Sequence, residues 1–268
     1  KNKMKKQKRI NKTGNRFGEQ AENYNKYRSE YPQEFYDFIF NLSKTKKVTN
    51  VLDMGCGTGK STEKLFYPGI KVVGCDHDSR MLNYARKNTR HHNLPIVYKK
   101  CEAENLPFKE NSFDIITIGN AFHWFANKKV AKNIERILKP NGLLFIYWKQ
   151  IDSEDIKLRR KIFRQFNSEY SGRGKLITSR ECSELLNNYE FQKTRHLIKK
   201  YKFNYNLESA VGRLKTIGSY FNLTPKQKLE FNNIAKKVFE NYISQRGKIT
   251  FSPTTHICYT YKRIINLK

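Results

Sequence analysis

The chain has 268 residues, enough for one α/β domain with a sizeable core and a smaller appendage. A composition of 38% hydrophobic and 13% aromatic residues argues against disorder, and no stretch approaches the roughly 20 apolar residues that span a bilayer. The net charge of +29 is spread along a lysine-rich chain without locally interleaved basic and aromatic residues, so we interpret it as compositional and keep a nucleic-acid partner as the less favoured alternative.

The first half of the chain predicts alternating strands and helices. A basic tail over residues 1–15 precedes helical segments between Phe17 and Leu42, which are broken at Tyr31-Pro32. Strands are then predicted at 51–54, 72–76, 96–98, 114–118 and, after the turn Pro140-Asn141-Gly142, at 143–147; helices are predicted at 60–67, 79–90 and 130–138. Apolar strands that alternate with helices predict a doubly wound, parallel sheet.

The second half predicts the remainder of the sheet and a helical insertion. Helices are expected at 154–170 and 179–188, a strand-like run at 192–204, a helical block at about 207–246 with a break at 223–225, and a last strand at 254–264. We therefore divide the chain into a tail (1–15), a ligand-binding core with an N-terminal lid helix (16–150) and a part that completes the sheet and carries the insertion (151–268).

The cysteines predict a reducing environment. Cys56, Cys75, Cys101, Cys182 and Cys258 are scattered along the chain and form no C-x-x-C pair. Neither a metal site nor a disulfide framework is expected, and the location predicted from this pattern is cytoplasmic. The oligomeric state stays open.

A glycine-rich turn joins the first strand to the next helix. Gly55, Gly57 and Gly59 alternate with other residues, which permits a tight turn and lets a ligand lie against bare backbone. Lys60 stands where a dinucleotide fingerprint has its third glycine, so the spacing disfavours a nicotinamide or flavin cofactor. Asp76 ends the second strand, where a carboxylate can accept hydrogen bonds from ribose hydroxyls.

Four stretches resemble the motifs of class I S-adenosylmethionine-dependent methyltransferases, and together they cover about residues 48–148. They are Val51–Gly59, Gly74–Leu82, Cys101–Phe108 with Ser112-Phe113-Asp114, and Arg136–Gly142. Phe17–Pro32 and Asn120–Phe125, and more loosely Gly212–Tyr220, resemble the trans-aconitate methyltransferase-like (methyltransferase type 11) subfamily, although Ser29-Glu30 departs from its pattern. The resemblance implies a Rossmann-like, mostly parallel seven-stranded sheet with an antiparallel C-terminal strand and a helical insertion over the active site.

The resemblance also implies the residues that bind S-adenosylmethionine. Gly55, Gly57 and Gly59 would pack on its methionine part, Asp53 would meet the amino group, Asp76 would hold the ribose, and Met81, Glu102 and Ala103 would surround the adenine. Asn120 would close over the methionine end, and Tyr24 and Arg28 would cover the site. Thr58 and His77 are the remaining residues predicted to bind the cofactor. For Tyr24 and Arg28, packing of a helix face on the core is an equally good interpretation.

The favoured function is methylation of a small molecule, with a carboxylate oxygen as the preferred acceptor. His123 and Trp124 follow a central strand, where His123 would act as a general base or, slightly favoured, only shape the pocket wall. Arg213, Lys215 or Tyr220 would contact the substrate. An RNA or protein methyltransferase, suggested by the charge, and a non-catalytic cofactor-binding scaffold are the alternatives.

Overall fold

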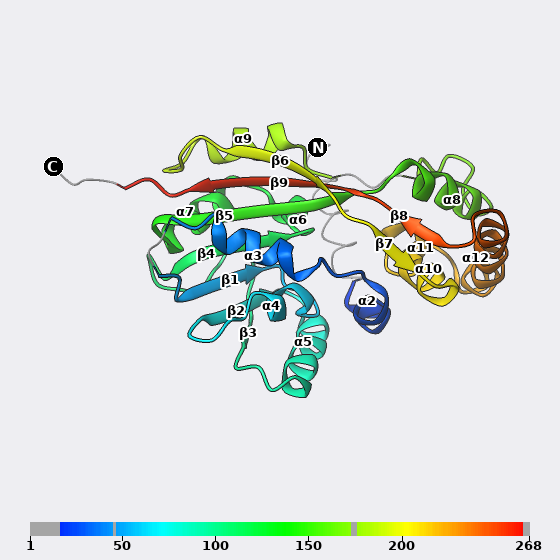
Figure 1. The fold of residues 1–268 in the computed structure, drawn as a ribbon, viewed down its shortest axis with the longest axis horizontal. Coiled ribbons are helices and arrows are strands. Elements are labelled where there is room, and N and C mark those ends of the chain that lie inside the picture. Colours follow the sequence, from blue (N-terminus) through cyan, green and yellow to red (C-terminus); the bar gives the residue numbers. More distant parts are fainter. Residues whose placement is uncertain (1–16, 45–46, 173–175, 265–268) are drawn as a thin grey trace. The chain divides into compact units, whose positions relative to one another are not determined.

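The computed structural model describes residues 17–44, 47–172 and 176–264, so the tail predicted at 1–15 lies outside the described residues. These residues form a seven-stranded sheet in the order β3-β2-β1-β4-β5-β9-β6 (Figure 1). The strands are β1 (Asn50–Met54), β2 (Lys71–Asp76), β3 (Val97–Lys100), β4 (Phe113–Gly119), β5 (Leu138–Gln150), β6 (Arg195–Lys200) and β9 (Thr254–Tyr261). The pairs β1–β2, β1–β4, β2–β3 and β4–β5 are parallel, whereas β9 runs opposite to β5 (Figure 1). The predicted sheet is confirmed.

The chain divides into two compact units. We call one the core unit, which contains Glu30–Trp148, Leu176–Lys199 and the segment that begins at His256. The other, the helical unit, contains the segment that ends at Ser29, together with Lys149–Lys175 and Lys200–Thr255.

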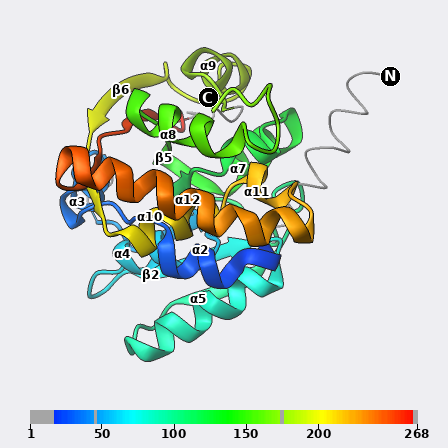
Figure 2. The same cartoon turned by 90° about the vertical axis from the view of Figure 1, so that its right-hand side faces the viewer.

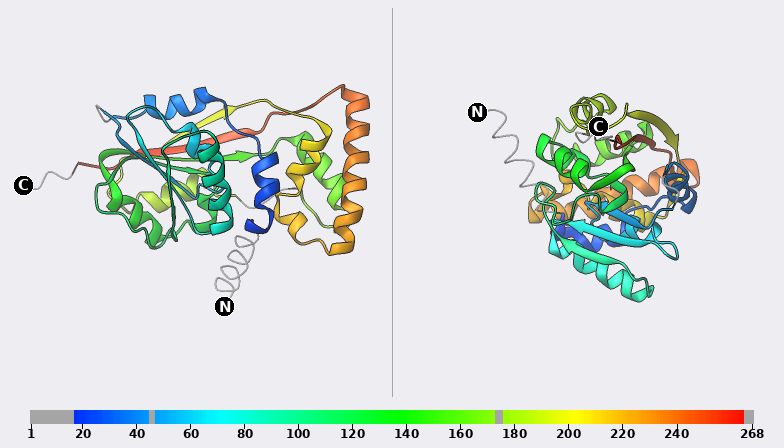
Figure 3. Two further views of the ribbon diagram at one scale, coloured as in Figure 1. Left: turned by 90° about the horizontal axis from the view of Figure 1, so that it is seen from below. Right: turned by 90° about the vertical axis from the view of Figure 1, so that its left-hand side faces the viewer.

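The two faces of the core unit's sheet are covered by different helices, because side chains alternate along β5. Leu144, Ile146 and Trp148 join a buried cluster with residues of α7 (Lys128–Ile137) and α9 (Ser179–Leu186). Phe145 and Tyr147 point the other way and contact Phe35 of α3 (Gln33–Asn41), with ring centroids 5.9 and 4.8 Å apart. Figure 3 shows these layers from two further directions.

Helix α5 (Ser79–His91) starts where the sequence predicts it. The side chain of Asp78 accepts a hydrogen bond from the backbone N–H of Arg80 at 2.9 Å, which satisfies one of the free donors at the helix start. Leu82 and Ala85 then pack with Tyr98 of β3 in a small buried cluster. The short helices α4 (Lys60–Lys64) and α6 (Phe122–Phe125) follow β1 and β4.

The helical unit has its own apolar core. Its helices are η1 (Gly18–Gln20), α2 (Ala21–Tyr27), α8 (Ser153–Phe163), α10 (Leu207–Leu214), α11 (Gly218–Phe221) and α12 (Pro225–Arg246). Figure 2 shows α12 beside α10 and α8, and Phe231 and Phe239 of α12 are fully buried in this core. Thr224 directly precedes Pro225 and forms a capping box with Gln227 at the start of α12, where the sequence predicts a break.

Several predicted boundaries were wrong. The run at 192–204 is not one strand: β6 ends at Lys200, and β7 (Phe203–Tyr205) pairs with β8 (Ile249–Phe251) in a separate two-stranded sheet. The helix predicted at 154–170 ends at Phe163. Pro140-Asn141-Gly142 lies inside β5 because Asn141 donates to the carbonyl of Lys262 at 3.0 Å, and Gly142 accepts from the N–H of Lys262 at 3.1 Å.

Candidate functional site

The glycine turn after β1 requires glycine for two reasons: its backbone conformation, and the lack of space for a side chain beside neighbouring residues. Gly55, Gly57 and Gly59 have φ angles of 73°, 54° and 82°, in the region that side chains disfavour. A Cβ atom on Gly55 would lie 2.7 Å from the Cβ of Ala121, and one on Gly59 would lie 2.5 Å from the Tyr98 hydroxyl. The turn is therefore held tightly against the loop after β4 and against β3.

Asp76, at the end of β2, joins the glycine turn to the next loop. Its carboxylate accepts hydrogen bonds from the backbone N–H groups of Gly57 and Asp78, both at 2.9 Å. His77 Nδ1 lies 3.2 Å from the same carboxylate, and this hydrogen bond raises the pKa of His77. Because a carboxylate offers about four acceptor positions, Asp76 keeps capacity for further donors such as hydroxyls.

Asp53 is a buried carboxylate at the base of the turn, with 1% of its surface exposed. It accepts hydrogen bonds from the hydroxyls of Thr62 at 2.7 Å and Thr117 at 3.0 Å. Burial raises its pKa to about 6, despite these two bonds. The hydroxyl of Thr58 in the same turn is buried without a hydrogen-bond partner among the described residues. A buried acid and an unsatisfied hydroxyl fit a ligand that brings a cationic group and a polar acceptor.

The loop after β3 lies beside Asp76. The backbone N–H of Cys101 donates to the carbonyl of Asp76 at 3.1 Å, which brings Glu102 and Ala103 to the same end of the sheet. Asn133 of α7 anchors this loop by donating to the carbonyls of Ala103 at 3.3 Å and Glu104 at 2.7 Å. Glu102 is exposed, whereas Met81, one turn into α5, is buried.

The segment Asn120–Phe125 follows β4 and completes this group of loops. Asn120 has a φ of 53° and donates its backbone N–H to the carbonyl of Tyr147 at 2.8 Å. The rings of His123 and Trp124 in α6 have centroids 4.8 Å apart. Burial lowers the pKa of His123 to about 4, so its imidazole is neutral at pH 7.

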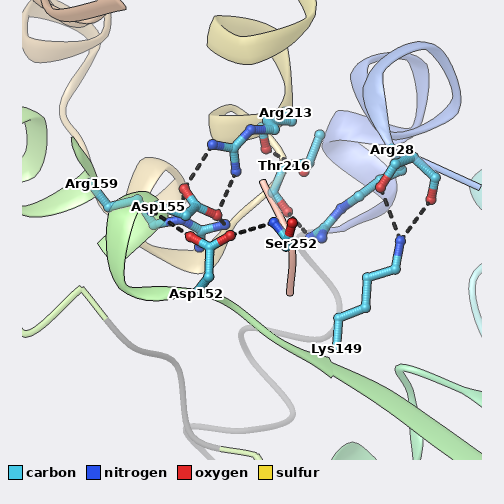
Figure 4. A network of polar contacts seen from close by, with 9 residues as sticks. Arg28, Lys149, Asp152, Asp155, Arg159, Arg213, Thr216 and Ser252 are labelled. Carbon is cyan, nitrogen blue, oxygen red and sulfur yellow. Dashed lines mark hydrogen bonds and ion pairs between the residues drawn. The ribbon is translucent and has the colours of Figure 1, made fainter. Parts of the chain in front are cut away.

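Five of the predicted site residues lie in the helical unit, and the structure gives partners there to Tyr24, Arg28, Arg213 and Tyr220. Arg28 donates to the carbonyl of Thr216 at 3.1 Å and lies over the ring of Tyr24, 5.0 Å from its centroid. Arg213 makes a two-pronged ion pair with Asp155, at 2.9 and 2.7 Å (Figure 4). Tyr220 is 8% exposed and is packed among apolar residues. Their contact with a cofactor or substrate stays a prediction.

Sequence reasoning did not identify three residues that support the site. Thr62 and Thr117 hold Asp53, and Tyr98 lies against Gly59. Thr117 gave a usable signal, because it is a polar residue inside an apolar strand, and it stands directly opposite Asp53 in the β1–β4 register. Thr62 and Tyr98 gave none, since each is ordinary for its helix or strand.

Among the described residues, there is neither a candidate metal site nor a candidate membrane span. No group of three or more His, Cys, Asp or Glu side chains could hold a metal ion. None of the described helices is long and apolar enough to cross a membrane.

Comparison with known proteins identifies the core unit. Residues 52–146 match the family model described as a methyltransferase domain. The chain is 29% identical over 137 residues to an uncharacterized methyltransferase of Schizosaccharomyces pombe, covering 50% of this chain and 53% of that protein. It is 28% identical over 185 residues to a probable S-adenosylmethionine-dependent methyltransferase of Saccharomyces cerevisiae, covering 67% of this chain and 62% of that one. The chain thus spans a little over half the length of these relatives.

A solved structure shows the same fold. A putative type II methyltransferase from Anaeromyxobacter dehalogenans superimposes with a TM-score of 0.58 at 16% identity, covering 88% of this chain and 98% of that one. These matches do not test the narrower likeness to trans-aconitate enzymes. Residues 52–146 thus match a methyltransferase domain, and the relatives and the fold support a class I S-adenosylmethionine-dependent methyltransferase.

Proposed function

We propose that the protein binds S-adenosylmethionine at the carboxyl ends of β1–β4 and methylates a small molecule, with a carboxylate oxygen as the acceptor. The observation that carries the proposal is the convergence of four loops there: Asp76 bonds to the glycine turn, Cys101 bonds to Asp76, and Ala121 lies against Gly55. Ligands of open α/β sheets bind at this edge.

The residues of these loops suit the separate parts of the cofactor. Asp53 would bind the amino group, and Gly55, Gly57, Thr58, Gly59 and Asn120 would surround the methionine part. Asp76 would accept from the ribose hydroxyls, with His77, Met81, Glu102 and Ala103 around the adenine. The raised pKa of Asp53 supports its role, because a cation beside a buried carboxylate offsets the loss of solvation.

Bound S-adenosylmethionine supplies a methyl group on a sulfonium, which an in-line nucleophile can displace. The protein's part in such a reaction is to orient the acceptor and exclude water. With the pKa of His123 at about 4, its imidazole is a poor proton acceptor at pH 7. A carboxylate acceptor needs no deprotonation, so a neutral His123 beside Trp124 would serve as pocket wall and hydrogen-bond partner.

Recognition of the acceptor is the part of the proposal that involves the helical unit. We assign it to the segment 207–246, with Arg213, Lys215 and Tyr220 as the candidate contacts, and assign Tyr24 and Arg28 to covering the cofactor. Arg213 already shares its charge with Asp155, so any substrate it contacts would bind beside an existing ion pair.

Titration calorimetry followed by a methyl-transfer assay tests the proposal. The protein should bind S-adenosylmethionine, and should transfer a tritiated methyl group to at least one member of a panel of small carboxylic acids. A methyl ester releases its label as volatile methanol in mild alkali, whereas N- or S-methyl groups keep it. Alkali-stable label would contradict the carboxylate acceptor, and absence of cofactor binding would contradict the whole proposal.

Cofactor affinity should depend on pH through Asp53. Because the cofactor's protonated amino group binds the carboxylate form, the affinity should be highest between about pH 7 and the pKa of that amino group, about 8, and fall by up to about tenfold per pH unit below about pH 6. Calorimetry at several pH values measures this. The matched control is Asp53→Asn, which should bind more weakly at neutral pH and lose this part of the pH dependence. An unchanged slope in Asp53→Asn would assign the titration to another group, such as His77.

A further inference from the structure

Cys75 and Cys101 are paired where the proposed ribose and adenine sites meet. In the β2–β3 register Cys75 lies opposite Lys99, and Cys101 follows two residues later. Cys101 directly follows β3, and its backbone N–H donates to the carbonyl of Asp76, the residue after Cys75, at 3.1 Å. Cys75 belongs to a buried apolar cluster, Cys101 packs against the same cluster, and each thiol affects the pKa of the other.

The two thiols have different environments. Cys75 is 2% exposed, and its hydrogen bond to Cys101 together with burial raises its pKa well above the usual range. Cys101 is half-buried; the hydrogen bond from Cys75 and the nearby cation of Lys99 lower its pKa, against the opposing effects of burial, Asp76 and Glu102. Because Cys101 is the more exposed of the two and lies near the cation of Lys99, a peroxide would reach Cys101 first, and Cys75 would react second.

We propose that Cys101 and Cys75 form a peroxide-sensitive thiol pair that closes to a disulfide beside the adenosine site. The Cys101 thiolate attacks one oxygen of a hydroperoxide; the O–O bond breaks, and Cys101 becomes a sulfenic acid. The departing oxygen takes up a proton to leave as water or an alcohol. The Cys75 sulfur then attacks the Cys101 sulfur, the S–O bond breaks, and the departing hydroxide takes up the Cys75 thiol proton and leaves as water. The two thiols lose two electrons and the hydroperoxide gains them.

The disulfide should oppose cofactor binding, and this consequence rests on the proposed function. Cys75 directly precedes Asp76, and Cys101 directly precedes Glu102. The backbone of Cys101 is also bonded to Asp76. A disulfide needs a sulfur separation of about 2.05 Å and a fixed dihedral angle, which two free thiols do not meet. Its closure must therefore shift the residues that would bind the ribose and the adenine.

Peptide mapping of the peroxide-treated protein tests the pair directly. The mapping must distinguish this pair from a second one, because the sulfurs of Cys182 and Cys258 lie 2.8 Å apart and both residues are fully buried. Mapping of the unaltered chain, after free thiols are blocked with iodoacetamide, should find Cys75 linked to Cys101, and dithiothreitol should reverse the link. The link should persist in Cys182→Ala/Cys258→Ala and disappear in Cys101→Ser.

Cys75→Ser gives the sharper readout. In that variant, dimedone should trap a sulfenic acid on Cys101, because the second thiol is missing. If Cys101 stays open to alkylation after peroxide treatment of the unaltered chain, or links to Cys56 instead, the pair is refuted.

Calorimetry separates this inference from the proposed function. The reduced protein should bind S-adenosylmethionine, the oxidised protein should bind at least about tenfold more weakly, and Cys101→Ser should be insensitive to peroxide. If the reduced protein does not bind S-adenosylmethionine, the proposed function is contradicted, but peptide mapping still tests whether Cys75 and Cys101 form a disulfide. If the disulfide forms and the affinity is unchanged, the control of cofactor binding is refuted.

Discussion

Replacing Asp155 with alanine should lower the free energy of unfolding by about 3–5 kcal/mol, because it leaves buried guanidinium groups without their counter-charge. Asp155 is 4% exposed and lies between two arginines of the helical unit (Figure 4). Arg213 donates to it at 2.9 and 2.7 Å, and Arg159 donates twice at 3.0 Å. Burial alone would raise the pKa of Asp155, but the two guanidinium groups hold it well below its usual range. Chemical denaturation followed by circular dichroism measures the change.

Two controls isolate the buried pair. Glu154→Ala, in the same helix, breaks an exposed ion pair with Lys157 and should cost less than about 1 kcal/mol. Adding Arg213→Met to Asp155→Ala should recover part of the loss, because one of the two unpaired charges is then gone and methionine can pack on the rings of Tyr205 and Phe251. A loss below about 1 kcal/mol in Asp155→Ala would contradict a structural role for the ion pair.

Arg213 also shows what the sequence alone cannot supply. An arginine in a helical insertion predicts a substrate contact as readily as an ion pair, because its partner Asp155 lies 58 residues away and no local pattern links the two. The same limit explains the separate sheet. Residues 203–205 continue the strand-like pattern of β6, and only the distant β8 decides that they pair elsewhere.

The elements that could be predicted from the sequence are those determined by interactions between residues close together in the chain. The start of α5 follows from Asp78, which caps it, and the start of α12 follows from Thr224-Pro225. The sheet follows from apolar runs long enough to be buried on both faces. The glycine turn was predictable because its backbone requires left-handed φ angles, whereas the closeness of Tyr98 and Ala121 to the turn depends on the completed fold.

Replacing Asp76 with asparagine should weaken the binding of S-adenosylmethionine and S-adenosylhomocysteine by about 10- to 100-fold. Hydrogen bonds to a charged group are worth about 1.5–3 kcal/mol, and both ligands carry the same ribose. The asparagine oxygen can keep one bond, to Gly57 or to Asp78, but its amide cannot accept from the other N–H or from a hydroxyl. Calorimetry with both ligands, alongside melting curves of the ligand-free protein, measures the loss.

Asp78→Asn is the matched control, because it changes a carboxylate two residues away in the same loop. Asp78 caps α5 through the backbone N–H of Arg80 at 2.9 Å and pairs with the Arg80 side chain at 2.7 Å, a role that asparagine largely preserves. Its affinity for the cofactor should stay within about threefold of the parent. Equal losses in the two variants would mean that the loop conformation, not a ribose contact, determines the affinity. An unchanged affinity in Asp76→Asn would place the ribose elsewhere and remove the central assignment of the proposed site.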